Sequence, residues 1–218
     1  MATVNIYRNK LKAASRFMAV QDIRYYLNGL LIESNPVQSR IVATDGHTLF
    51  ASRDDAKCDN AGSFTGIMPA DTVKAILAWK APHKSANDNP VILTTSDDPA
   101  GEHRATWCGN VCVFRLIDGK FPDYARVVPA TLEAGISFFQ PEYLLRCTKA
   151  AQDLNTSAKG YFDFKCAQDG TGLAVFSPQS FAVIMPIKTV VADVADVAWA
   201  REPLPAPVAE PVAEPVAA

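Results

Sequence analysis

One unit of secondary structure recurs three times along this chain of 218 residues. Each unit is expected to hold a short apolar strand, one amphipathic helix and two or three further strands. The helices are predicted near 8–19, after Pro69 to about Trp79, and from near Pro141 onward. Proline is tolerated in a first helical turn because its missing N–H would be unpaired there. A period of about 60 to 70 residues with one helix per unit predicts an α+β fold of three βαβββ units.

The strands are predicted from short apolar runs bounded by turn residues. In the first unit they are expected at 4–6, 24–33, 39–44 and 47–52. In the second unit they are expected at 63–68, 90–95, 103–107 and 110–117. In the third unit they are expected at 136–139, 160–166, 172–176 and 180–187.

The composition changes after Thr189. Residues 190–218 contain five acids, one base and a repeated Val-Ala-Glu-Pro sequence at 208–215, which cannot assemble a core. We therefore expect an extended, disordered tail over 190–218. Since the whole chain has a formal charge of -2 and the tail contributes -4, residues 1–189 carry +2. A weakly basic region of this kind is compatible with DNA binding but is only weak evidence for it.

Cysteine usage and hydropathy indicate a cytoplasmic protein. The five cysteines are odd in number and form no Cys-x-x-Cys pair, which is typical of reduced thiols. The first residues lack the apolar stretch of a signal peptide, and no run reaches the ~18 apolar residues of a membrane span. We therefore expect neither secretion nor contact with a membrane.

The first predicted helix has a basic face. Arg8, Lys12 and Arg16 recur at every fourth position, and no acid occurs within 8–19. A charged helix face is usually just solvated. The absence of compensating acids along the helix makes this face a candidate for contact with phosphates.

Catalytic readings of the sequence lack support. Asp45 and His47 flank Gly46, and Cys147 is a possible nucleophile, but the spacing supplies no third member of a catalytic group. A tight turn at Asp45-Gly46 explains the first pair better. The histidines and cysteines lack metal-ligand spacing, and no Gly-rich phosphate loop is present. We expect no metal, no cofactor and no enzymatic activity; a hydrolase or nuclease using Asp45 and His47 is the disfavoured alternative.

Four sequence blocks resemble the bacterial DNA polymerase III beta subunit, the sliding clamp. They are Gln21-Asp22-Ile23-Arg24-Tyr25-Tyr26-Leu27-Asn28-Gly29, Ala43-Thr44-Asp45-Gly46-His47-Thr48-Leu49, Phe121-Pro122-Asp123-Tyr124-Ala125-Arg126-Val127 and Val183-Ile184-Met185-Pro186-Ile187-Lys188. Their order and spacing are similar to those of the family's middle domain and chain end. The resemblance implies a DNA-clamp fold with antiparallel sheets outside and helices on the inner face.

The resemblance implies a hydrophobic groove that receives short peptides of DNA polymerase and of the clamp loader. Apolar side chains and Met give an adaptable slot, and Arg and His orient a peptide. The groove residues carried over are Leu27, Thr44, Gly46, His47, Leu49, Pro122, Arg126, Val127, Gln140, Tyr143, Val183, Ile184, Met185, Pro186 and Ile187.

The same resemblance implies sequence-independent contact with double-stranded DNA through phosphates. The DNA-facing residues are expected to be Arg8, Lys12, Arg16, Gln21, Arg24 and Tyr25. The chain departs from the family pattern at Thr48 and Ala125, where the family usually carries arginine. Peptide acids are therefore expected to be held less well.

The resemblance covers residues 1–189 and divides them into two parts. Residues 1–129 resemble a complete middle domain, and 130–189 resemble the second half of the C-terminal domain. The family's other units have no counterpart in this sequence. Two functions remain open: a processivity factor, in which a homo-oligomeric ring tethers a polymerase to DNA, and a non-ring mimic that sequesters or recruits clamp-binding proteins.

Overall fold

The computed structural model describes residues 1–55, 60–98, 100–132, 137–154 and 159–187. The chain separates into one compact unit, Met1–Ile187, and a second, Lys188–Ala218. The predicted boundary after residue 129 lies inside the first unit, and the predicted tail at 190–218 lies outside the described residues. None of the described helices is long and apolar enough to cross a membrane.

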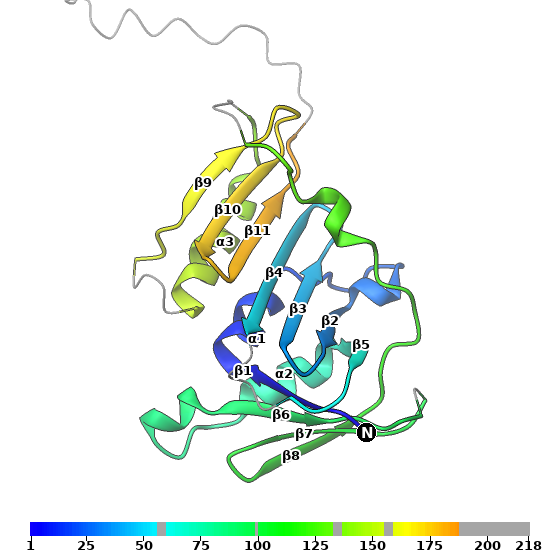
Figure 1. Cartoon of the computed structure of the whole chain (residues 1–218). Helices are drawn as coiled ribbons and strands as arrows, with labels where there is room; N and C mark the ends of the chain where they lie inside the picture. The colour runs from blue at the N-terminus through cyan, green and yellow to red at the C-terminus, as the bar shows by residue number, and fades with distance from the viewer. Residues whose placement is uncertain (56–59, 99, 133–136, 155–158, 188–218) are drawn as a thin grey trace, which may run out of the picture. The chain divides into compact units, whose positions relative to one another are not determined.

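The first two units follow the expected order βαβββ, whereas the described part of the third unit holds one helix and three strands (Figure 1). The first unit holds β1 (Thr3–Tyr7), α1 (Arg8–Ser15), η1 (Tyr25–Leu27), β2 (Gly29–Ser34), β3 (Gln38–Thr44) and β4 (Thr48–Asp55). The second holds β5 (Phe64–Pro69), α2 (Ala70–Ala78), η2 (Lys84–Asp88), β6 (Pro90–Thr94), β7 (His103–Trp107) and β8 (Asn110–Phe114). After η3 (Tyr124–Val127), the third holds α3 (Pro141–Asp153), β9 (Asp163–Cys166), β10 (Gly172–Ser177) and β11 (Ser180–Ile184).

The first two units exchange their first strands. β1 pairs antiparallel with β6, so that Val4 lies opposite Leu93, and β5 pairs antiparallel with β2, so that Ile67 lies opposite Leu31. The four-stranded sheet therefore has the order β1-β6-β7-β8. Because each sheet contains a strand from both units, neither unit completes its sheet alone.

The third unit continues the other sheet. β11 pairs antiparallel with β4, with Val183 opposite Leu49, which extends the sheet to seven strands in the order β5-β2-β3-β4-β11-β10-β9. Main-chain hydrogen bonds thus join the first and third units directly. This junction places the β3–β4 turn next to the residues that follow β11, because the Met185 N–H donates to the His47 carbonyl at 2.9 Å.

One core takes side chains from both sheets and all three helices. Leu11 of α1, Val73 of α2 and Cys147 of α3 are fully buried in it, together with Phe50 of β4 and Leu93 of β6. α1 contacts both α2 and α3. A smaller core forms on the opposite face of the seven-stranded sheet, where Phe121 and its neighbours in segment 117–128 cover Leu31 and Val42. The predicted α+β clamp fold is confirmed by this arrangement and by the structural neighbours described below.

Several predicted element bounds were wrong. α1 ends at Ser15 instead of residue 19, and residues 25–27 form a 3₁₀ turn instead of the start of a strand. β8 ends at Phe114 instead of residue 117. Residues 137–139 form no strand; there the Phe138 carbonyl accepts one backbone hydrogen bond from Ile187 at 2.8 Å. Phe17, Met18 and Ala19 are buried although the helix has ended, so tertiary packing and not helical periodicity accounts for this apolar run.

Candidate functional site

A tight turn between β3 and β4 forms one end of the candidate groove. One carboxylate oxygen of Asp45 accepts hydrogen bonds from the His47 N–H at 2.9 Å, the Thr48 N–H at 2.7 Å and the Thr48 hydroxyl at 3.0 Å. Gly46 has φ +92°, a conformation that a residue without Cβ adopts at little cost. The turn is therefore rigid and presents the exposed His47 ring to solvent.

A second side chain fixes this turn from the third unit. Arg146 of α3 forms an ion pair with Asp45 and also donates to the Thr48 hydroxyl at 3.3 Å. Burial alone raises the pKa of Asp45, but hydrogen bonds from Thr48, Arg146 and His47 outweigh it and hold that pKa below its ordinary value. The carboxylate is thus ionised and fully engaged in structural bonds, which leaves it unsuited to act as a catalytic base.

An apolar pocket of about 210 Å³ lies between this turn and segment 122–127. Leu49 and Leu27 are buried in its walls, and Met185 and Val127 are partly exposed. Eight predicted groove residues line it together: Leu27, Thr44, Gly46, His47, Leu49, Pro122, Val127 and Met185. The pocket brings η1, the β3–β4 turn, η3 and the end of β11 into one site.

The remaining predicted groove residues lie elsewhere. Val183 and Ile184 are fully buried as core residues of β11. Tyr143 stacks on His47, with ring centroids 6.4 Å apart, and so extends the pocket rim without lining the pocket. Four further predicted residues do not line the pocket. Pro186 is partly exposed, and the other three are exposed: Arg126, Gln140 and Ile187.

Arg24, predicted to face DNA, lines the pocket. Its guanidinium donates to both carboxylate oxygens of Asp22, at 3.0 and 2.7 Å, and to the Asp45 carbonyl at 3.3 Å. Hydrogen bonds from Arg24 lower the pKa of Asp22 to about 2, so the pair stays charged at neutral pH. An added Cβ at Gly46 would lie 2.9 Å from the Arg24 guanidinium. The charge of Arg24 at the pocket rim is therefore paired with that of Asp22.

Sequence reasoning missed other residues that line this pocket. Tyr26, Thr48, Asp123 and Tyr124 belong to the lining. Each stands within one of the four sequence blocks, one or two positions from a residue that was predicted. Since neighbours in a turn or a 3₁₀ segment point in less regular directions than strand residues, the sequence alone did not show which of them face the pocket.

The predicted DNA-facing helix residues are all engaged with other parts of the chain. Arg8 donates to the carbonyls of Leu77 and Trp79, at 2.8 and 2.9 Å, and its guanidinium lies 4.3 Å from the centroid of the Trp107 ring. It therefore caps the C-terminal end of α2, where carbonyls lack helical partners. This position makes Arg8 a structural residue.

Lys12 and Arg16 share one acid that the sequence pattern did not reveal. Asp153, at the end of α3, forms ion pairs with both, 2.9 Å from Lys12 Nζ. Its side chain is 5% exposed, whereas that of Lys12 is 57% exposed. Gln21, with φ +54°, and Tyr25 are exposed in the loop before β2. The basic face of α1 is thus partly neutralised by α3.

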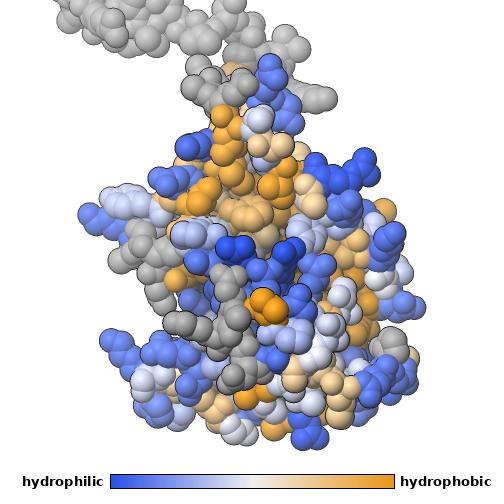
Figure 2. All heavy atoms as spheres, in the orientation of Figure 1, coloured by the Kyte–Doolittle hydropathy of each residue, from blue (hydrophilic) through white to orange (hydrophobic). Residues whose placement is uncertain are grey.

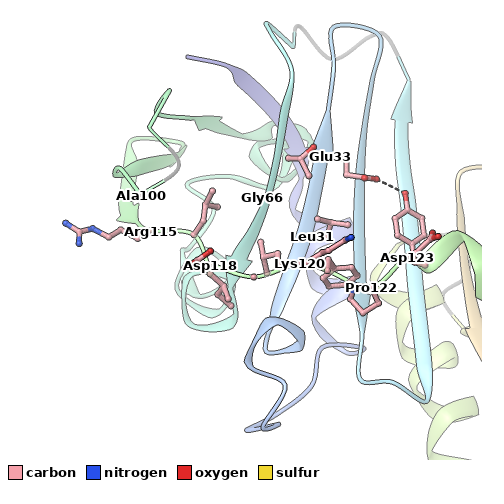
Figure 3. A pocket seen from close by; sticks show the side chains of 16 residues that line it. Leu31, Glu33, Gly66, Ala100, Arg115, Asp118, Lys120, Pro122 and Asp123 are labelled. Atoms are coloured by element: carbon pink, nitrogen blue, oxygen red, sulfur yellow. Dashed lines mark hydrogen bonds between the residues drawn. The ribbon is translucent and has the colours of Figure 1, made fainter.

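A larger cavity of about 930 Å³ lies beside the groove, between the β2–β5 pair and segment 115–124 (Figure 3). Its lining mixes Leu31 and Ile67 with the charged side chains of Glu33, Arg115 and Lys120. The Tyr124 hydroxyl donates to Glu33 at 2.6 Å and forms the boundary between this cavity and the apolar pocket.

The described residues contain no group of three His, Cys, Asp or Glu side chains placed to hold a metal ion. Cys147, considered above as a nucleophile, is fully buried, and burial raises the pKa of its thiol to about 12. A thiol so buried and so weakly acidic is inert.

Comparison with known proteins decides the family. The family model described as DNA polymerase III beta subunit, central domain, matches residues 4–123. This chain belongs to that family. The family resemblance read from the four sequence blocks is therefore confirmed, as is the prediction that the chain is not an enzyme, since the family consists of clamp subunits.

Curated relatives of this family member are beta sliding clamps. The chain is 38% identical to the clamp of Pseudomonas aeruginosa over 128 residues, and this match covers 56% of the chain and 31% of that protein. It is 33% identical over 144 residues to the clamp of Escherichia coli K12, which covers 62% of the chain and 36% of that protein. The matched region thus spans about a third of each relative's length.

Solved sliding-clamp structures share the fold of this chain. A ligand-bound clamp of Pseudomonas aeruginosa matches with a TM-score of 0.64 and 23% identity over 86% of this chain and 66% of that one. The Helicobacter pylori beta clamp bound to a DNA ligase peptide matches with a TM-score of 0.64 and 12% identity over the same shares of the two chains. At these identities the likeness establishes the fold alone.

Proposed function

We propose that the apolar pocket at the β3–β4 turn binds short linear peptides of DNA polymerase and clamp-loader proteins. Through this binding the chain acts as a clamp-like factor in DNA replication. The observation that supports this best is the pocket itself, in which segments far apart in the sequence meet. A solved relative from Helicobacter pylori was crystallised with a DNA ligase peptide, which is consistent with peptide binding in this family.

The pocket chemistry favours an aliphatic or aromatic side chain as its occupant. Leu27 and Leu49 give it a fixed apolar floor, and Met185 supplies a flexible wall that adapts to different side chains. Arg24 and His47 stand at the rim, where they can orient peptide carbonyl or carboxylate groups. A peptide with Gln, a few residues and Leu-Phe fits this pattern.

Peptide affinity tests the proposal. Such a peptide is expected to bind in the micromolar range, roughly -8 kcal/mol. The double variant Leu49→Ala with Met185→Ala should weaken binding at least tenfold. Val113→Ala is the matched control, because Val113 is exposed and lies on the four-stranded sheet, none of whose strands lines the pocket. Equal affinity of the folded double variant and the wild type would remove the pocket from the account.

A second function is favoured by the charges on α1. In the described part of the chain, Arg8 caps α2, Lys10 pairs with Asp54, and both Lys12 and Arg16 pair with Asp153. A helix whose cations are engaged internally has fewer charges for phosphates. This observation supports the non-ring mimic, which occupies clamp-binding peptides without encircling DNA.

Solution mass and DNA retention separate the two functions. A ring that tethers a polymerase requires an oligomer, and it is retained on circular DNA but slides off linear DNA. The mimic is expected to bind the same peptide as a monomer and to show no difference between circular and linear DNA. Light scattering of the full chain, followed by gel filtration with each DNA form, distinguishes them.

A further inference from the structure

β8 (Asn110–Phe114) is an unprotected edge of the four-stranded sheet. The sheet has the order β1-β6-β7-β8, so no other described strand pairs with the outer side of β8 (Figure 1). An edge strand leaves a row of backbone N–H and C=O groups open to pairing with another chain, and proteins commonly protect such an edge with charges, proline or a bulge. β8 has the sequence Asn-Val-Cys-Val-Phe and a regular register with β7, so it has none of these protections.

The outer face of this edge is apolar. Val111 and Val113 are 54% and 51% exposed. Ile92 of β6, which is 40% exposed, lies in the same cross-strand row as Val111. The β9 edge of the other sheet differs, because β9 exposes the charged side chains of Asp163 and Lys165. An exposed apolar edge strand is typical of a surface that pairs with another strand.

The junction between the first and third units shows how such an edge is covered in this fold. β4 is the last strand of the first unit, and it pairs antiparallel with β11, the last strand of the third. The outer face of this junction is apolar, with Leu49 opposite Val183 and Ala51 opposite Phe181. Figure 2 shows apolar side chains gathered over β10 and β11, with hydrophilic side chains beside them. β8 is the last strand of the second unit, and of these three described strands it alone has no strand on its outer side.

We propose that β8 pairs antiparallel with β8 of a second copy of this chain and so joins two copies about a two-fold axis. This inference goes beyond the proposed peptide-binding function and does not depend on it, because no residue of β8 lines the peptide pocket. Pairing between the last strands of two units is the arrangement that the chain already uses between β4 and β11. A second copy gives β8 the partner that the third unit gives β4.

The β4–β11 junction also indicates the register. Its middle pair is Phe50 opposite Ala182, and both side chains are buried in the core. Cys112 is the middle residue of β8, and it points to the core side because the buried Phe114 stands two positions away. The middle of β8 therefore corresponds to the middle of the junction.

A two-fold axis at Cys112 brings the exposed valines together. Cys112 then lies opposite itself, and Val111 of each copy lies opposite Val113 of the other. β-Branched side chains that face each other across two strands stabilise a sheet, and this pairing removes both valines of each copy from water. A head-to-tail contact between β8 and β9 of a second copy would instead bring the valines against Asp163 and Lys165, at the cost of charge hydration.

The helices add area to this contact. α1 contacts α3 across the β4–β11 junction, and α2, which contacts β8, exposes the small side chains of Ala75 and Ala78. In the equivalent arrangement, α2 of one copy approaches α2 of the other. A pair of five-residue strands by itself is smaller than the roughly 1,200–2,000 Å² buried in a stable interface, so we expect a reversible dimer with micromolar affinity. One isologous contact joins two copies only, so this dimer is not itself a ring, and retention on circular DNA separates the two.

Mass in solution tests the contact. Light scattering of the full chain from about 1 to 200 μM should show the mass rising from 23.6 kDa toward twice that value. Val111→Lys with Val113→Lys places like charges opposite each other and should keep the protein a monomer throughout. Val37→Lys, at an exposed valine between β2 and β3, is the control and should dimerise as the wild type does. A wild type that stays a monomer, or a dimer that the double variant retains, would overturn the proposal.

Mixtures of variants test the register and distinguish a lost contact from misfolding. Val111→Lys and Val113→Glu should each dimerise several-fold more weakly than the wild type. Their equimolar mixture should regain the dimer, because the new lysine of one copy lies opposite the new glutamate of the other. Val111→Lys mixed with Val111→Glu should regain less, since these positions are not opposite; equal recovery in both mixtures, or none in either, refutes the proposed pairing. Peptide affinity should be the same in every variant, so a failed dimer leaves the proposed function intact.

Discussion

Substitution of Asp153 by asparagine should separate the structural from the DNA-binding role of the basic helix. Asp153 lies at the end of α3 and pairs with Lys12 and Arg16 of α1. Burial alone raises its pKa, but hydrogen bonds from Arg16 and Lys12 outweigh burial and lower that pKa. Asparagine keeps the shape of the side chain and removes its charge.

The loss of stability follows from how exposed the partners are. A hydrogen bond to a charged group contributes about 1.5–3 kcal/mol when it is shielded from solvent and well below that when it is exposed. Because the Arg16 side chain is 29% exposed and that of Lys12 is 57% exposed, we expect Asp153→Asn to cost about 1–2 kcal/mol. For a protein of this size the melting temperature should fall by roughly 2–8 °C.

DNA binding should move in the opposite direction. Two cations released from Asp153 are available to phosphates, and each phosphate contact changes the slope of log K against log salt by about 0.9. We expect the slope for a short duplex to steepen by about 1–2 units in anisotropy titrations across a salt series. Asp163→Asn, an exposed acid on β9, is the control with the same change in net charge. An unchanged slope, or equal steepening by both variants, would refute contact between α1 and DNA.

Three further predictions concern the turn and the buried thiol. Gly46→Ala should lower thermal stability and weaken peptide binding more than Gly109→Ala does. Both glycines have positive φ, but only at Gly46 would the new Cβ press on Arg24. Equal effects of the two variants in melting and anisotropy would contradict this. Native Cys147 should resist maleimide at pH 8, because burial raises the pKa of its thiol to about 12, while the exposed Cys108 should react. Mass spectrometry measures both reactions. Rapid labelling of Cys147 would show that its helix opens. The lowered pKa of Asp45 means that its stabilising contribution is present above the unfolded pKa of about 4 and is lost as pH falls through the lower folded value. Asp45→Asn should therefore flatten the acid side of the stability curve, and an identical curve in melts between about pH 2 and 6 would exclude this contribution.

The sequence predicted the order of the helices and strands but not their sheets. Short apolar runs showed that strands 3–7 and 64–69 exist, yet each pairs with the other unit's strands. Such an exchange leaves no local signal, since apolar periodicity reports burial and not the partner. The helix predicted over 8–19 stops at Ser15, and Phe17 and Met18, whose apolar pattern extended the prediction, are buried beyond the end of the helix.

The structure brings eight predicted groove residues into one pocket, whereas the predicted DNA-facing residues of α1 bond to other parts of the chain. Residues such as Leu49 and Met185 belong to family blocks, and they meet because β4 and β11 pair. The charge pattern of α1 did not show that Asp153 compensates Lys12 and Arg16 from more than a hundred residues away. Long-range ion pairs of this kind cannot be read from the spacing of charges within one helix.

Photocrosslinking tests most directly whether the pocket binds peptides. The Gln…Leu-Phe peptide carrying a photoreactive group in place of its phenylalanine ring is mixed with the full chain, irradiated, and mapped by mass spectrometry. The account predicts crosslinks to the pocket walls at Leu27, Leu49, Val127 and Met185, which an excess of unlabelled peptide suppresses. Crosslinks confined to other surfaces such as β8 or β9, or none above background, would contradict the proposed function.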